Sequence, residues 1–158
     1  MDSLAAEISD QKISSVFIYT HEAHPGEKVP HHTSFKQKLR HAALMRDVAG
    51  VQRPILVDAI DGACHRFFGS MPNMTWIISR AGIAVYKSDW TDSESLRRTI
   101  RDLDDMTAER KRTRVPTAPF RVERLEYRQR DRKAFIHWLE EHAGPKAVAE
   151  YTAVFGRK

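Results

Sequence analysis

The stretch Val16 to Tyr19 constrains the fold most, because four consecutive apolar or aromatic β-formers run directly into a polar loop. Such a run favours a strand that is buried on both faces of an α/β sheet, and Pro25-Gly26 must end it. Ligands of open α/β sheets gather at the carboxyl ends of the strands. We therefore predict a functional site in this loop, which carries two histidines and two carboxylates: His21, Glu22, His24 and Glu27.

The whole chain limits what such a site can belong to. With 158 residues, of which 41% are hydrophobic, it can bury one substantial core and one appendage. No basic stretch followed by an apolar run opens the sequence, and no apolar run reaches about 20 residues. We expect a soluble, cytoplasmic protein without a membrane partner. The single cysteine, Cys64, excludes an internal disulfide, a Cys-x-x-Cys pair and a multi-cysteine zinc site.

The net charge of +5 is unevenly distributed along the chain. Residues 1–105 have a balance of −1, whereas residues 106–158 have a balance of +6. A charge run at 109–114 followed by Pro116 and Pro119 indicates a boundary near Thr107 to Pro119. We therefore predict a domain over residues 1–105 and a basic helical extension over residues 106–158.

Helix and strand signals alternate in the first two thirds of the chain. A helix carrying Leu4 and Ile8 should precede the first strand. A second helix should be capped by Ser34 and end at Gly50, with these residues on one face: Phe35, Leu39, Ala42 or Ala43, and Met45 or Val48. A strand at Pro54 to Asp58 and one or two helical turns at Cys64 to Phe68 should follow.

The next signals predict a hairpin and a last helix. The hairpin strands are Thr75 to Ile78 and Ile83 to Tyr86, around the turn Arg80-Ala81-Gly82. The helix should carry Leu96, Ile100 and Leu103 and be capped by Thr91 or Ser93, with Glu94 in a capping box if Thr91 is the cap.

The basic extension has amphipathic order. Apolar residues recur at helical spacing in two short segments, Phe135, Trp138, Leu139 and His142 before the Gly144-Pro145 break, and Val148, Tyr151 and Phe155 after it. A Glu126/Arg130 pair at i, i+4 precedes them. These patterns predict a helical hairpin that docks on the domain or on a second copy of the chain, as a homodimer. Nucleic-acid binding is not expected, because the charges are mixed in sign and no recognition motif accompanies them.

The predicted order α–β–α–β–β–β–α is the thioredoxin-like arrangement without its opening strand. Within it, the segment Tyr19-Thr20-His21-Glu22-Ala23-His24 resembles the Tyr-Ile-x-Glu-Ala-His signature of the iodothyronine deiodinase family. The resemblance spans roughly Leu4 to Leu103. Within this span, further stretches are similar to the bacterial deiodinase-like branch of thioredoxin-fold proteins: Pro25-Gly26-Glu27, Ser34 to Ala43, Pro54 to Asp58, Asp61-Gly62, Pro72-Asn73 and Asp89-Trp90.

The resemblance implies a reductive chemistry. Deiodinases remove iodine from an iodothyronine ring with a selenocysteine or cysteine on the loop after the first strand. In this chain that strand and its nucleophile would lie upstream of Met1. Glu22 and His24 would then be the supporting groups, moving a proton or holding substrate, since His titrates near neutral pH. We expect an external thiol as reductant, no bound cofactor, and a small-molecule or thiol substrate.

Several alternatives remain open for these residues. Glu22 and His24 could instead only cap and brace the loop. His21, His24, His31 and His32, with Glu22 and Glu27, have the side chains of a zinc or iron site. However, His21 and His24 leave an extended strand in opposite directions, so the sequence does not predict a metal.

Three further residues have both a functional and a structural interpretation. Cys64 is either a small buried side chain or a peroxidatic or resolving thiol beside His65 and Arg66. Pro72 invites comparison with the cis-proline of thioredoxin-like proteins, although Asn73 is nearer that position. Together with His21, Cys64, Pro72 and Asn73 form a secondary set of substrate-binding or redox candidates.

The sequence leaves two classes of function. One is a deiodinase-like redox protein whose nucleophile lies upstream of Met1, so that the 158-residue chain is inactive or incomplete. A selenocysteine codon, which resembles a stop, would explain a gene start assigned at the next methionine. The other is a non-catalytic thioredoxin-fold module that binds partners through the same cleft or through its helical tail.

Overall fold

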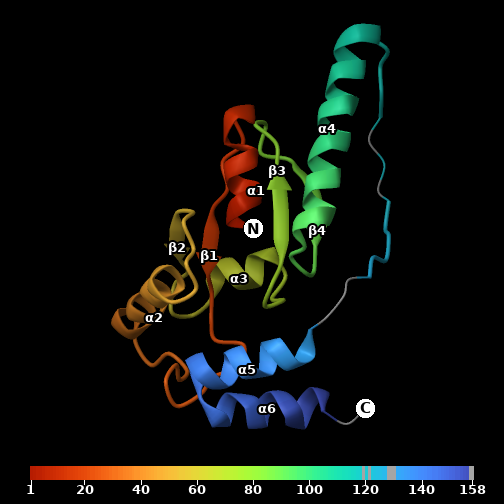
Figure 1. Ribbon diagram of the computed structural model, residues 1–158. Helices are drawn as coiled ribbons and strands as arrows, with labels where there is room; N and C mark the ends of the chain where they lie inside the picture. Colours follow the sequence, from red (N-terminus) through yellow and green to blue (C-terminus); the bar gives the residue numbers. More distant parts are fainter. Residues whose placement is uncertain (119, 121, 128–130, 157–158) are drawn as a thin grey trace.

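A computed structural model describes residues 1–118, 120, 122–127 and 131–156 and shows a mixed α/β fold (Figure 1). The expected alternation of helices and strands is confirmed. In chain order the elements are α1 (Asp2–Glu7), a 3-10 turn (Ser9–Gln11), β1 (Phe17–Tyr19), α2 (Phe35–Asp47), β2 (Ile55–Val57), α3 (Ala63–Phe68), β3 (Thr75–Ile78), β4 (Ala84–Ser88), α4 (Ser93–Thr113), α5 (Arg132–Ala143) and α6 (Pro145–Phe155).

The strands form two separate pairs. β1 and β2 are parallel, with Ile18 opposite Leu56, and β3 and β4 form the antiparallel hairpin that the sequence predicts. In the described part of the chain, each pair is a two-stranded sheet, and no backbone ladder joins β1 to β3. The α/β class is thus confirmed, whereas a single thioredoxin-like sheet remains a prediction.

β1 is buried on one face only. Tyr19 is 5% exposed, but Ile18 is 38% exposed and Val16, just before the strand, is 45% exposed. Successive side chains of a strand point to opposite faces. The prediction of burial on both faces is therefore wrong, because the face that carries Ile18 is left partly open.

The main core lies between α1 and α4. Leu4 of α1 and Ile8, the residue that caps this helix, pack with Leu96 and Ile100 of α4, and side chains of both hairpin strands pack against this cluster. The sequence predicted all four residues on the apolar faces of helices, and this prediction is confirmed.

Asp2 connects α1 to the start of β2. Its Oδ1 atom accepts hydrogen bonds from the backbone N–H groups of Gln52, at 2.9 Å, and Arg53, at 3.1 Å, and from the Arg53 side chain at 3.2 Å. The N-terminal helix therefore contacts the segment just before β2, while its apolar side packs on the hairpin.

α2 begins as predicted but buries a different face. The Ser34 hydroxyl accepts a hydrogen bond from the Gln37 N–H and caps the helix. The residues predicted to face the core, Phe35, Leu39 and Val48, are 45%, 46% and 48% exposed. Lys38 and His41 are buried instead, together with Ala42, one of the two alanines that the sequence did predict on the buried face. Lys38 donates a hydrogen bond from Nζ to the Ala59 carbonyl at 2.8 Å, so α2 turns its polar side toward the loops.

The turns around β3 and β4 follow the sequence signals, with one correction. α3 ends at Gly69, and the hairpin turn contains Gly82, both with positive φ. The N-cap of α4 is Asp92, whose carboxylate accepts a hydrogen bond from the Ser95 N–H. Neither Thr91 nor Ser93 is the cap; the Thr91 hydroxyl bonds instead to the Asn73 carbonyl at 3.1 Å.

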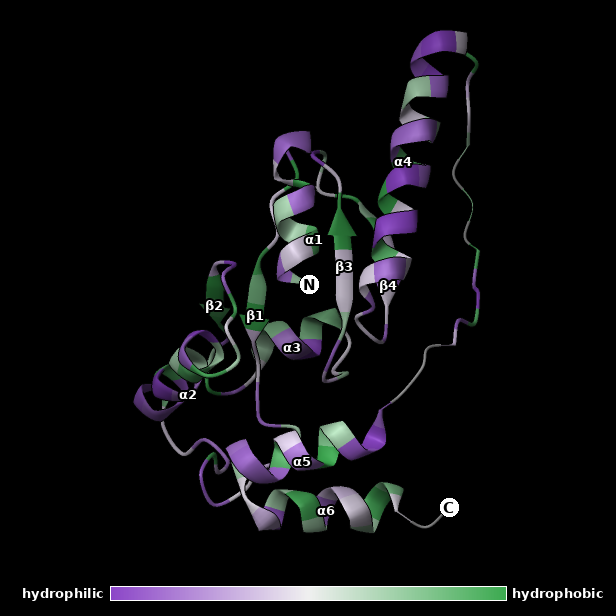
Figure 2. Ribbon diagram, in the orientation of Figure 1, coloured by the Kyte–Doolittle hydropathy of each residue, from purple (hydrophilic) through white to green (hydrophobic). Residues whose placement is uncertain are grey.

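α4 continues past the predicted domain boundary to Thr113. Its residues from 104 onward are exposed, and Figure 2 shows this end as mostly hydrophilic.

No helix of the described ranges has both the length and the apolar character needed to cross a membrane. Pro119 of the predicted boundary, and Arg130 of the predicted Glu126/Arg130 pair, lie outside the described residues.

The C-terminal helical hairpin forms as predicted and docks on the loop after β1. Its core consists of Leu139, Ala143, Ala147 and Tyr151. The Lys28 N–H donates to the Ala143 carbonyl at 3.1 Å, and the Glu27 carboxylate accepts from the Lys146 N–H at the start of α6. The alternative of docking on the domain is thus confirmed (Figure 1).

Gly26 makes this docking possible. A Cβ atom at this position would lie 2.1 Å from the Ala143 carbonyl oxygen and 3.1 Å from the Ala147 Cβ. Real Cβ atoms do not approach a carbonyl oxygen so closely, so any larger residue must push the hairpin away from the loop.

We expect Gly26→Ala to lower the free energy of unfolding by about 1 to 3 kcal/mol, the usual range for overpacking. The measurement is urea denaturation monitored by circular dichroism. The control is Gly50→Ala, which adds a Cβ with no atom within 4 Å and carries only the strain of a positive φ, about 1 kcal/mol. Equal or smaller destabilisation by Gly26→Ala would contradict the observed packing.

Candidate functional site

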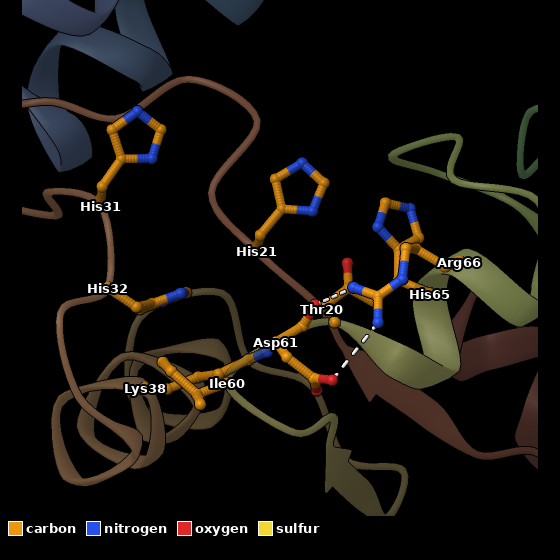
Figure 3. Close-up of a pocket in the computed structure, with 10 residues that line it drawn as sticks. Thr20, His21, His31, His32, Lys38, Ile60, Asp61, His65 and Arg66 are labelled. Carbon is orange, nitrogen blue, oxygen red and sulfur yellow. Dashed lines mark hydrogen bonds and ion pairs between the residues drawn. The ribbon is translucent and has the colours of Figure 1, made fainter.

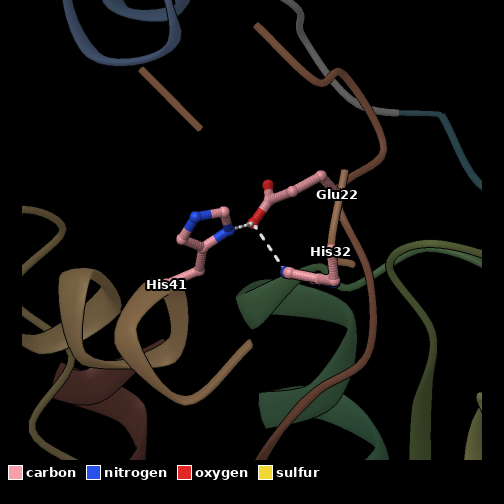
Figure 4. Close-up of side chains that lie close together, drawn as sticks. All are labelled: Glu22, His32 and His41. Carbon is pink, nitrogen blue, oxygen red and sulfur yellow. Dashed lines mark ion pairs between the residues drawn. The ribbon is translucent and has the colours of Figure 1, made fainter. Parts of the chain in front are cut away.

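The loop after β1 meets α2 at a cluster of three potential donors, Glu22, His32 and His41 (Figure 4). The Glu22 Oε1 atom lies 3.8 Å from His32 Nε2 and 3.8 Å from His41 Nδ1. All three donor atoms lie within 4.8 Å of one another. These side chains are mostly buried, at 20%, 6% and 9% exposed respectively. The cluster lies in the loop after β1, where the sequence predicts a functional site.

Burial keeps this cluster from becoming an ion pair. Desolvation raises the pKa of Glu22 to about 7. Desolvation, with the positive charges of His41 and Lys38, lowers the pKa of His32 to about 4. Burial also lowers the pKa of His41. Glu22 therefore ionises only after both imidazoles have become neutral.

A hydrogen bond from outside the cluster holds His32 in place. The Tyr19 hydroxyl lies 3.1 Å from His32 Nε2, and the two rings meet edge to face. Tyr19 is the last residue of β1, so the buried end of the strand orients His32. His41 Nδ1, in contrast, is buried without a hydrogen-bond partner.

His24 lies elsewhere, against the C-terminal hairpin. Its ring centroid is 5.3 Å from that of Tyr151, 6.2 Å from Phe135 and 6.4 Å from Phe155, all edge to face. Burial lowers its pKa, and the charge of Glu150 opposes this shift. The imidazoles beside Glu22 are thus His32 and His41, while His24 packs against the aromatic residues of the docked helices.

An open pocket of about 240 Å³ adjoins the cluster (Figure 3). Its lining is mainly basic and polar: Thr20, His21, His31, His32, Lys38, Ile60, Asp61, Gly62, His65 and Arg66. The rings of His21 and His65 are 4.7 Å apart, and burial together with the charge of His65 lowers the pKa of His21. This pocket suits a small polar or anionic molecule.

Cys64 does not have the environment of a reactive thiol. It is partly buried on α3, and burial together with the charge of Asp58 raises its pKa. Asp58 accepts hydrogen bonds from the N–H groups of Cys64 and His65, at 3.0 and 2.9 Å. Although burial alone would raise the pKa of Asp58, these bonds and the charge of Lys38 lower it. A nucleophilic thiolate is disfavoured beside such a carboxylate.

Pro72 and Asn73 lie on the surface before β3. Asn73 forms a β-bridge with Trp90. The described residues include no cis peptide bond, so the cis interpretation of Pro72 is wrong.

Sequence analysis missed His41. The apolar residues Phe35 and Leu39 indicate a different buried face of α2, and His41 is not on that face. The available signal was the spacing of Lys38, His41 and Ala42 at i, i+3 and i+4, which places them on one face of the helix.

Comparison with protein-family models, curated proteins and solved structures gave no match to this chain. The deiodinase resemblance therefore stays a prediction, and the geometry of the site carries the functional argument.

The electrostatics of Glu22 predict a pH-dependent effect of removing its charge. Folding raises the pKa of the Glu22 carboxyl group from 4.5 to about 7. The folded protein therefore binds the carboxyl proton more tightly than the unfolded chain does. The contribution of Glu22 to the free energy of unfolding therefore decreases as the pH rises from 4.5 through 7. Glu22→Gln should leave stability unchanged below this range and increase it by up to about 3 kcal/mol above it.

Urea denaturation across this pH range measures the difference between the two proteins. The control is Glu140→Gln, at an exposed carboxylate of α5. If Glu22→Gln destabilises the protein above neutral pH, the burial of Glu22 does not disfavour its charged form.

Proposed function

We propose that this chain is part of a thioredoxin-like redox module with deiodinase-like chemistry. The arrangement of the strands is the observation that carries the proposal. A parallel pair, β1–β2, and an antiparallel hairpin, β3–β4, are the two halves that flank the central strand of such a sheet. In Figure 1 the two pairs are drawn on either side of α1. A strand inserted between β1 and β3 would join them into one sheet.

The position of Glu22 supports the same chemistry. It follows the carboxyl end of β1 by three residues and points into a mostly buried cluster. A loop following an inserted central strand would end at the same edge of the sheet, since that strand is parallel to β1 in the thioredoxin-like arrangement. A buried carboxylic acid that keeps its proton near neutral pH is suited to general acid catalysis.

The nucleophile is proposed to be a cysteine or selenocysteine encoded upstream of Met1, because the pKa of Cys64 is shifted in the wrong direction. Its thiolate or selenolate takes the leaving group X from a carbon atom, so the C–X bond breaks and an S–X or Se–X bond forms. Glu22 gives its proton to the carbon. Two external thiols then release X as an anion, become a disulfide and restore the nucleophile. A cytoplasmic location would supply such thiols.

The DNA upstream of the Met1 codon tests this proposal. We expect an in-frame segment that encodes an apolar strand followed by a cysteine codon or a TGA codon. The protein extended by this segment should show thiol-dependent reductase activity with an iodinated aromatic substrate, and Glu22→Gln should reduce its turnover by about 10²-fold or more.

Glu140→Gln, at an exposed carboxylate of α5 away from the pocket, is the matched control and should keep its turnover. Absence of such an upstream segment, or full activity of the 158-residue chain, would refute the redox proposal.

A second candidate is a non-catalytic module that associates with itself through the C-terminal hairpin. The observation in its favour is apolar exposure on α5 and α6 after docking, with Trp138 45% and Val154 71% exposed. Large exposed apolar side chains mark interaction surfaces when they cluster. In this candidate, His24 and Gly26 serve only to hold the hairpin.

This second candidate predicts that the 158-residue chain is a dimer, and that Trp138→Glu or Val154→Glu makes it a monomer. Light scattering coupled to size-exclusion chromatography measures the mass. Val115→Glu, at a residue that is 58% exposed beyond α4, should leave the dimer intact. A monomeric wild-type chain excludes self-association through these helices.

A further inference from the structure

We propose that Glu22, His32 and His41 form a binding site for a divalent transition-metal ion of the zinc class. The inference does not depend on the redox function. It rests on the geometry of three side chains that come from two different elements, the loop after β1 and helix α2.

The donor set has the right chemistry. Two imidazole nitrogens and one carboxylate oxygen are the ligands of many zinc and non-haem iron sites, which leave further positions for water or substrate. Two of the donor separations are 3.8 Å, and all are within 4.8 Å. Ligands of a tetrahedral ion, each about 2.0 to 2.2 Å from the metal, lie about 3.3 Å apart. The two 3.8 Å separations would have to close by about half an ångström, and the remaining one, between the two histidines, by up to about 1.5 Å.

His41 supplies an observation independent of this spacing. It is 9% exposed, and its Nδ1 atom is buried with no hydrogen-bond partner. Figure 4 shows this nitrogen directed at the Glu22 carboxylate. A buried polar atom without a partner costs free energy. A metal ion between the two side chains would satisfy His41 Nδ1 and the Glu22 oxygen together.

Hydrogen bonding among the three residues does not explain the cluster. A separation of 3.8 Å is too long for a hydrogen bond. The one short contact of the cluster joins His32 Nε2 to the Tyr19 hydroxyl at 3.1 Å. Metal binding through Nε2 would replace this bond and leave the Tyr19 hydroxyl beside the ion, where it can accept a bond from a metal-bound water.

The surrounding charges act against a cation and limit its affinity. Lys38, His21 and His31 are close enough to His32 to affect its titration. Lys38 is held by the Ala59 carbonyl, so its charge stays fixed near the site. We therefore expect a site that prefers divalent transition metals with strong imidazole affinity and does not retain magnesium or calcium, which prefer oxygen ligands.

Metal binding and the proposed acid role of Glu22 exclude each other at any one moment. A carboxylate that coordinates a metal has no proton to donate. If both proposals hold, zinc inhibits the reductase, whereas failure of the redox proposal leaves zinc binding unaffected.

The test is zinc titration of the metal-free 158-residue chain by isothermal calorimetry, with thermal denaturation as a second measurement. We expect one zinc ion per chain and a higher melting temperature in its presence, because a ligand of the folded state stabilises it by mass action. Glu22→Gln, His32→Asn and His41→Asn should each weaken binding by at least about tenfold, since even outer partners of metal ligands have effects of this size.

His31→Asn is the matched control, because it removes an exposed imidazole next to His32 that is not part of the cluster. It should bind zinc like the wild type. If His41→Asn fails to fold, the Glu22 and His32 variants still decide the question. Absence of zinc binding by the wild type, or equal losses in His31→Asn and His32→Asn, would overturn the proposal.

Discussion

The docking of α5 and α6 on the loop after β1 is the interaction on which the candidate site depends. The loop is fixed at Gly26, where its backbone meets Ala143, and at Glu27, whose carboxylate receives the first N–H group of α6. Glu22 lies at one end of this fixed segment and His32 lies just beyond its other end. A loop of this length without such contacts would sample many conformations, and the two side chains would not stay within 4 Å of each other. The C-terminal hairpin is therefore part of the architecture of the site.

The cluster of Glu22, His32 and His41 conflicts with the usual rules for buried polar groups. Its members are desolvated, their pKa values move in the directions that disfavour charge, and one nitrogen has no partner. Folded proteins rarely keep such an arrangement for stability alone, because hydrophobic residues of similar size would cost less free energy. Local violations of packing rules are most often found at functional sites. This is why the two proposals, proton donation and metal binding, both centre on the Glu22 carboxylate.

Local sequence signals predicted the elements well and their orientation less well. Ser34, Gly69 and the Gly144-Pro145 break mark helix ends, because capping and positive φ are properties of short segments. Of the residues predicted on the buried face of α2, Ala42 is buried, whereas Lys38 and His41 take the interior positions expected for larger apolar side chains. Their burial depends on the Ala59 carbonyl and on Glu22, which lie far away in the sequence. The pairing of two strands instead of a continuous sheet also depends on contacts between distant segments.

The sequence by itself determined the α/β class, the strand that ends in a polar loop and the two C-terminal helices, because periodicity, turn residues and caps act over a few residues. It also placed Glu22 in the site. Only the tertiary structure decided which imidazoles accompany that carboxylate. It brought His32 and His41 to Glu22 and sent His24 to the aromatic face of the hairpin. The physical reason is that the loop after β1 folds back between α2 and the C-terminal helices. The side of the loop on which each histidine becomes buried therefore determines which residues it contacts.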